Sequence, residues 1–125
     1  MQKLVIVLFS FFLVSPVFAA GSFIDYSVNG EQFEGYYVPA KSGGPLVLMI
    51  HDWDGVTDYE VKRAGMLAEL GYGVFAVDLF GKGVRPSETE AKRKLTGELY
   101  SNRIRMRELI NAGLEKAVEL GANTS

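Results

Sequence analysis

The chain has 125 residues, of which 48% are hydrophobic and 22% are charged, and its formal net charge is −2. These values are typical of one globular domain and exclude an intrinsically disordered chain. Removing a leader that contains Lys3 would change the charge to −3. Neither charge favours nucleic acid or an anionic membrane surface as a partner.

The composition also restricts metal and thiol chemistry. The sequence contains no cysteine, which excludes a disulfide framework and a thiolate zinc site. It contains one histidine, which excludes a histidine-rich metal cluster. Carboxylates could still bind a hard cation, but no spacing favours such a site. We therefore expect no metal site.

The first twenty residues are typical of a secretory signal peptide. Lys3 provides a positive start, Leu4 to Val14 is an apolar region interrupted only by Ser10, and cleavage is expected after Ala19 or Ala20. The apolar run is shorter than the roughly 18 residues that span a bilayer. An uncleaved anchor is the alternative. We expect residues 21–125 to be secreted or periplasmic and free of the membrane after cleavage.

The mature chain begins with a predicted β-hairpin. Residues 23–28 and 32–38 are rich in aromatic and β-branched residues, and they flank Asn29-Gly30, which is typical of a type I′ turn. After a polar turn, Leu46 to Ile50 form an apolar run without alternation. Such a run favours a strand buried on both faces of a parallel sheet. We expect the sheet to be built around this strand.

A helix and a second apolar strand follow. Thr57 and Glu60 have the spacing of a capping box, and small residues recur at helical spacing from Val61 to Ala68. Gly71 is placed to end this helix. Residues 73–78 form the second apolar strand. A single intervening helix predicts that the two strands are parallel.

The rest of the chain is predicted to be largely helical. Ser87 and Glu90 match a second capping box, and helical sequence extends to about Leu120 with a break near Gly97. An apolar face follows, formed by Met106, Ile110, Gly113, Leu114, Ala117 and Val118. Residues 121–125 are predicted to be a loop. The fold class is α/β, a hairpin followed by a βαβα series. Since that series normally continues into another strand, we expect the chain to be truncated.

Polar residues gather after the two apolar strands. His51, Asp52, Trp53 and Asp54 follow the first strand, and Lys82 and Arg85 follow the second. Ligands bind outside the carboxyl ends of strands in open α/β sheets, so these residues form the candidate site. Carboxylates and cations there could form a pair near a substrate anion. The backbone N–H of Trp53 could face an oxyanion.

Structural roles are the alternatives for each of these residues. His51 could be a buried, hydrogen-bonded histidine, Asp78 could cap a turn, and Asp54 could stabilise the start of the next helix. Trp53 could cover the end of the sheet. The series Arg103, Arg105 and Arg107 could be a solvated helix face rather than a binding patch.

Several catalytic and nucleotide-binding motifs are absent from this sequence. No G-x-S-x-G occurs, and none of the serines after residue 21 lies in a strand-to-helix elbow. No G-x-G-x-x-G or Walker A pattern occurs either. A flavodoxin-like nucleotide binder therefore receives no support.

The motifs together resemble the dienelactone hydrolase family of α/β-hydrolases over about residues 22–125. The matching segments are Gly35-Tyr36-Tyr37-Val38-Pro39, Leu46 to Val56 with its His51-Asp52-Trp53-Asp54-Gly55, Leu70 to Gly73, and Val77 to Gly83. The resemblance implies the N-terminal part of a three-layer α/β-hydrolase fold. It also implies hydrolysis of small-molecule esters or lactones by nucleophilic acyl transfer, without a cofactor.

The resemblance assigns roles to four residues of this chain. It implies that Asp52 takes part in activating the nucleophile and that the Trp53 backbone N–H belongs to the oxyanion hole. It implies that Lys82, or else Arg85, contacts a substrate carboxylate. The nucleophile elbow and the later aspartate and histidine would lie beyond Ser125, so we expect this chain alone to be inactive. The alternative function is a non-catalytic secreted α/β binding or interaction module.

Overall fold

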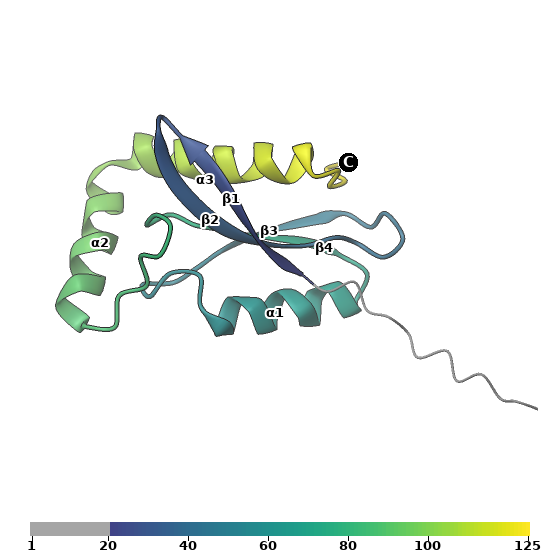
Figure 1. Ribbon diagram of the computed structural model, residues 1–125, viewed down its shortest axis with the longest axis horizontal. Coiled ribbons are helices and arrows are strands. Elements are labelled where there is room, and N and C mark those ends of the chain that lie inside the picture. The colour runs from purple at the N-terminus through teal and green to yellow at the C-terminus, as the bar shows by residue number, and fades with distance from the viewer. Residues whose placement is uncertain (1–20) are drawn as a thin grey trace, which may run out of the picture.

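The computed structural model describes residues 21–125, and the predicted signal peptide lies outside them. Four strands form one mixed sheet, and three helices surround it (Figure 1). In chain order the elements are β1 (Ser22–Val28), β2 (Glu31–Val38), β3 (Leu46–Ile50), α1 (Asp58–Glu69), β4 (Gly73–Val77), α2 (Thr89–Ser101) and α3 (Arg103–Glu119). The strand order across the sheet is β1-β2-β4-β3.

The predicted hairpin is confirmed. β1 and β2 pair antiparallel from Ser22 with Tyr37 to Val28 with Glu31, so two residues form the turn. Those residues, Asn29 and Gly30, have φ angles of 51° and 83°. Two positive φ angles are the requirement of a type I′ turn, which Asn-Gly meets at low cost.

The predicted parallel pair is also confirmed, but the predicted centre of the sheet is wrong. β3 and β4 are parallel, from Leu46 with Gly73 to Ile50 with Val77. β4 also pairs antiparallel with β2 and is buried along its whole length. β3 instead lies at the edge of the sheet, and its last residue, Ile50, is 46% exposed. Within residues 21–125, β4 is therefore the strand around which the sheet is built.

Helices cover both faces of the sheet, as a three-layer fold requires. α1 and α3 lie on opposite sides of it, and α2 stands at one end (Figure 1). On one face, Ala64 of α1 packs with Val38 and Val74. On the other, Leu109 of α3 packs with Phe75. Because each face of the sheet has its own small core, the residues of β4 that point to either face are all apolar.

α3 approaches β4 closely because it has a glycine at the contact. A Cβ added at Gly113 would lie 2.6 Å from Val77, closer than real Cβ contacts come. The buried face of α3 consists of Leu109, Gly113 and Ala117. The predicted face was wrong in part: it omitted Leu109 and included Val118, which is 50% exposed.

The first predicted capping box is confirmed and the second is wrong. The Thr57 side chain accepts from Tyr59 N (3.3 Å), and Glu60 accepts from Thr57 N (2.8 Å). Gly71 follows α1 with a φ of +100°, as predicted for its C′ residue. At α2 the N-cap is Glu88, which makes no side-chain capping bond.

The predicted break near Gly97 is also displaced. The helix ends at Asn102, whose ψ of 75° interrupts the helical path. The Asn102 side chain then caps α3 by accepting from Arg105 N (3.1 Å). The break therefore serves as the start of α3 and turns α2 away from it.

The end of the chain returns to the edge of the sheet. Asn123, in the segment predicted to be a loop, forms a parallel bridge with Pro45, and Leu46 N donates to Asn123 O at 2.7 Å. Asn123 Nδ2 also donates to Gly43 O (2.8 Å). Among residues 21–125, no helix has both the length and the apolar character needed to cross a bilayer.

Candidate functional site

A cavity of about 480 Å³ lies where β3 and β4 end, and α2 forms its other wall. The strands contribute their carboxyl-terminal loops, which is where ligands bind in sheets of this type. Most of the lining side chains are apolar or aromatic. They are Ile50, His51, Asp52, Trp53, Leu79, Phe80, Thr96, Leu99, Tyr100 and Met106. The structure thus brings the predicted residues His51, Asp52 and Trp53 together around one cavity.

His51 joins the two loops that follow β3 and β4. Its ring is buried, and Nε2 accepts from Leu79 N at 3.1 Å. An accepting Nε2 requires the neutral tautomer with its proton on Nδ1, which lies 2.6 Å from Asp52 O. The Phe80 ring packs beside it, with 4.6 Å between centroids. The geometry therefore matches the structural role weighed for His51, because both ring nitrogens are used within the fold.

Asp52, which lines the cavity, and Asp54 form a pair of neighbouring carboxyl groups. Asp54 N approaches Asp52 Oδ1 at 3.4 Å. The hydrogen bond between the two side chains raises the pKa of Asp52 and lowers the pKa of Asp54. The Lys92 ammonium, 3.7 Å from Asp54 Oδ2, lowers the pKa of Asp54 further. Of the two, Asp52 is therefore the carboxyl that takes up a proton more readily.

Trp53 presents both its ring and its backbone at this rim. Trp53 is 43% exposed, and Lys92 Nζ lies 5.2 Å from the ring centroid. The backbone N–H of Trp53 forms no hydrogen bond with another backbone group of residues 21–125. The ring thus contacts α2, while the N–H next to the cavity is left for another partner.

Lys82 does not lie in the wall of this cavity. Its ammonium forms an exposed ion pair with Asp25 of β1, and its backbone N–H donates to Gln32 O at 2.9 Å. Asp25 raises the pKa of Lys82. The loop after β4 therefore attaches Lys82 to the hairpin, apart from Asp52 and Trp53.

Arg85 is held inside the fold. Its guanidinium donates to Val56 O at 2.5 Å and to Glu34 O at 3.2 Å, and it lies 3.6 Å from the buried Asp78 carboxylate. Asp78 in turn accepts from Phe80 N at 3.0 Å, which matches the turn-capping role weighed for it. The expectation that Lys82 or Arg85 meets a substrate anion beside Asp52 gains no support from this arrangement.

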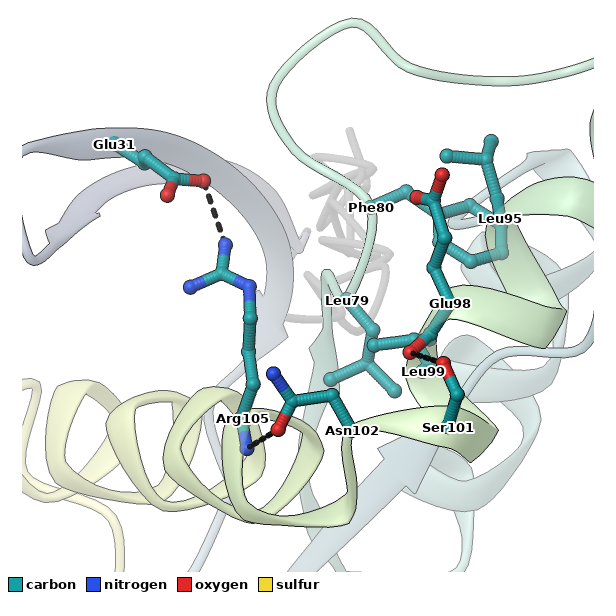
Figure 2. Close-up of a pocket in the computed structure, with 9 residues that line it drawn as sticks. All are labelled: Glu31, Leu79, Phe80, Leu95, Glu98, Leu99, Ser101, Asn102 and Arg105. Carbon is teal, nitrogen blue, oxygen red and sulfur yellow. Dashed lines mark hydrogen bonds and ion pairs between the residues drawn. The ribbon is translucent and has the colours of Figure 1, made fainter.

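A second cavity of about 430 Å³ lies on the other side of α2. Figure 2 shows its walls: the start of β2, the loop after β4, α2 and the start of α3. Arg105, taken from the arginine series expected to be solvated, bonds to Glu31 across this opening (2.6 Å, Figure 2). Leu79, Phe80 and Leu99 line both cavities and so separate them.

The α2 residues of the site were not found by sequence reasoning. Thr96, Leu99 and Tyr100 line the first cavity, and Lys92 contacts Trp53 and Asp54. A signal was present in the spacing, since residues four apart on a helix share a face. Within residues 21–125, no group of three or more histidine, aspartate or glutamate side chains is arranged to bind a metal ion.

Comparisons with known proteins agree on one family. The model of the dienelactone hydrolase family matches residues 33–124. A protein of Aquifex aeolicus (strain VF5) named "Putative carboxymethylenebutenolidase" is 30% identical over 87 residues, and "Protein usf" of Aquifex pyrophilus is 29% identical over 87 residues. Each of these matches covers 67% of this chain and 37% of the relative, so the chain spans well under half the length of these curated relatives.

Two solved structures resemble this fold with a TM-score of 0.72. One, m3DLH, is 32% identical, and the match covers 78% of this chain and 42% of that one. The other is the dienelactone hydrolase-like promiscuous phosphotriesterase P91 from metagenomic libraries, which is 21% identical, with 84% and 44% covered. The arrangement of strands and helices is therefore that of the N-terminal part of an α/β-hydrolase fold.

Proposed function

Since the chain belongs to the dienelactone hydrolase family, we propose that it supplies one wall of an acyl-transfer site that hydrolyses small-molecule esters or lactones. The observation that carries the proposal is the cavity of about 480 Å³ after β3 and β4, in which Asp52 and Trp53 lie side by side. A hydrolytic site needs a stabilised oxyanion and a group that handles a proton near the nucleophile. This wall offers a candidate for each.

The Trp53 backbone N–H is the proposed oxyanion donor. It has no backbone partner within residues 21–125, and its loop is tied down by the His51 hydrogen bonds on one side. A fixed donor costs no reorganisation when charge develops on the substrate oxygen. Removing a single donor of this kind typically costs about 100-fold to 1000-fold in kcat.

Asp52 is the proposed proton-handling group. Its side chain is exposed, and Asp54 raises its pKa. A carboxyl whose proton is held more tightly than usual can exchange that proton with a nucleophile nearby. The nucleophile itself is not assigned to any residue of this chain, since the sequence has no cysteine and no serine elbow.

Two experiments test this proposal. The purified chain is expected to hydrolyse a chromogenic ester no faster than a heat-treated control; faster hydrolysis would show a nucleophile within it.

For the positive test, residues 21–125 replace the matching segment of m3DLH, and ester hydrolysis by this chimera is measured. Asp52→Asn should lower kcat by at least about 10-fold. Asp58→Asn, an exposed change on α1, is the matched control and should leave kcat unchanged. A folded chimera that hydrolyses no ester, or one that Asp52→Asn leaves fully active, would contradict the proposal.

We also propose that the protein is exported. The support is the sequence pattern of residues 1–20, with Lys3 before an apolar run and small residues at Ala19 and Ala20. The mature N-terminus should then be Ala20 or Gly21, which intact-mass measurement of the exported protein would identify. A protein that keeps Met1 and pellets with membranes would support the anchor instead.

A further inference from the structure

Lys92 occupies an unusual position among the cations of α2. Its Nζ lies 3.7 Å from Asp54 Oδ2 and 5.2 Å from the centroid of the Trp53 ring. The side chain is 17% exposed, whereas its neighbours Arg93 and Lys94 are exposed. One amine therefore contacts two successive residues of the loop after β3. A solvated surface lysine would contact neither.

The helix that carries Lys92 is only partly buried, and its Leu99 packs against the hydrophobic core. α2 has no buried residue, and the Asn102 break separates it from α3. One turn after Lys92, Thr96 lines the cavity, followed by Leu99 and Tyr100. Leu99 attaches the C-terminal half of α2 to the core, and the contacts with the loop after β3 attach the half that carries Lys92. Lys92 provides an ion pair and a cation–π contact among them.

We propose that Lys92 is a positioning residue that fixes the loop of residues 52–55 against α2. By holding the Trp53 ring and the Asp54 carboxylate together, it sets where the Trp53 N–H and the Asp52 carboxyl lie in the cavity. An isolated exposed ion pair contributes little, but here the same ammonium also covers an aromatic ring, and the Lys92 side chain is only 17% exposed. The catalytic consequence rests on the proposed function, whereas the docking itself does not.

The same contact adds to the charge asymmetry of the Asp52–Asp54 pair. The hydrogen bond from the Asp52 side chain lowers the pKa of Asp54 most, and Lys92 lowers it further, so Asp54 is the carboxyl that stays ionised more readily. The other charged group that acts on Asp52 is Glu60 of α1, which also favours its protonated form, while the His51 ring beside it bonds to Leu79 N and Asp52 O. Removing the Lys92 charge should therefore raise the pKa of Asp54.

The sequence provides a direct probe, because Trp53 is its only tryptophan. The chain is purified with Lys92→Met, Lys92→Arg or Lys94→Met, and circular dichroism establishes that each is folded. In Lys92→Met one face of the indole loses its cover, so acrylamide quenching of Trp53 should increase by up to about twofold. Lys92→Arg, which keeps a cation that can stack on the ring, should restore the wild-type value. Lys94→Met should not change it.

A pH titration separates positioning from a general loss of structure. The acid transition of Trp53 fluorescence should shift to higher pH in Lys92→Met at low salt, since Asp54 loses its cation. A merely structural role would lower the melting temperature without moving this transition. In the m3DLH chimera, Lys92→Met should lower kcat more than it changes KM.

Three outcomes would overturn the proposal: unchanged quenching in Lys92→Met, an unmoved acid transition, or an equal response to Lys94→Met. If Lys92→Met does not fold, the unmodified chain is measured by NMR. The Lys92 ε-methylene protons should then be shifted upfield by the ring current of the indole, and unshifted signals would refute the contact. An inactive chimera with altered quenching would refute the proposed function and leave the positioning role standing.

Discussion

Tyr26 and Asp78 lie 52 residues apart in sequence, and the Tyr26 hydroxyl forms two hydrogen bonds with the backbone of Asp78. The Tyr26 hydroxyl donates to Asp78 O at 3.3 Å and accepts from Asp78 N at 3.2 Å. Both residues are buried, and burial raises the pKa of the Tyr26 hydroxyl well above its usual range. The hairpin is in this way attached to the end of β4, where the loop to the candidate site begins.

Tyr26→Phe should therefore destabilise the fold although the ring is kept. The buried Asp78 N–H loses its acceptor, and a buried unsatisfied group costs about 1–3 kcal/mol. Urea denaturation measures the loss in free energy of unfolding. Tyr59→Phe removes a hydroxyl from a side chain that is 58% exposed and is the control, expected within about 0.5 kcal/mol of wild type. Equal values for the two variants would argue against a role of the buried pair.

Arg85→Lys should be destabilising, in spite of the conserved charge. A lysine ammonium cannot match the planar set of donors that reaches Val56 O, Glu34 O and Asp78 at once. We expect a loss of about 2–3 kcal/mol, measured by urea denaturation. Lys82→Ala, in the neighbouring exposed pair, should leave the midpoint unchanged. If Arg85→Lys is as stable as wild type, the guanidinium is free to serve a ligand instead.

Asp52→Asn and Asp54→Asn should have opposite effects on stability at neutral pH. The pKa of Asp52 is raised in the folded protein. Its protonated form therefore stabilises the fold when the pH is below 3.8, the ordinary pKa. This contribution is lost as the pH rises through the pKa of the folded state. Asp52→Asn should therefore be more stable than wild type at pH 7. The lowered pKa of Asp54 contributes stability above 3.8, which is lost as the pH falls. Asp54→Asn should be less stable at pH 7.

The measurement for this pair is the urea midpoint at pH 7 and at pH 3. Both differences should shrink at the acidic value, where the unfolded carboxyls are protonated too. Both side chains lie near solvent, so the shifts in midpoint should be small and should diminish with added salt. Shifts of the same sign in the two variants would refute the assigned directions.

Thr57→Ala should cost about 1 kcal/mol, because the substitution removes the side-chain cap of α1. Ser87→Ala should cost nothing measurable, since Glu88 and not Ser87 is the N-cap of α2. Thermal denaturation of the two variants compares them directly. A cost for Ser87→Ala similar to that for Thr57→Ala would mean that the second capping box forms in solution.

The sequence predicted well those elements whose causes are local. The Asn29-Gly30 turn, the Thr57–Glu60 cap and the Gly71 helix end each depend on residues within one turn of the chain. Ser87 and Glu90 satisfied the same local pattern, yet the extended backbone of Glu88 placed the helix start one residue later. The break predicted near Gly97 does not occur there, because one glycine destabilises a helix by only about 1 kcal/mol and α2 continues through it.

The errors concern what covers each element, which local patterns do not report. The unalternated apolar run Leu46–Ile50 predicts a strand that can be buried on both faces. It does not predict which strands and helices will lie beside that strand. Lys82 and Arg85 were placed correctly on the loop after β4, but their partners, which include Asp25 and Glu34 O of the hairpin, lie about 50 or more residues earlier in the chain. Lys92 was missed because its partners lie almost 40 residues earlier in the chain.

The position of β3 at the sheet edge has a practical consequence for handling this protein. Beyond the single bridge from Pro45 to Asn123, its outer backbone groups have no sheet partner within residues 21–125. The segment Leu46–Ile50 carries no charge, proline or bulge that would discourage a neighbouring chain from adding to it. Preparations of residues 21–125 should consequently scatter more light as they are concentrated. The substitution Ile50→Lys, at an exposed position of this edge strand, should reduce the aggregation and the light scattering.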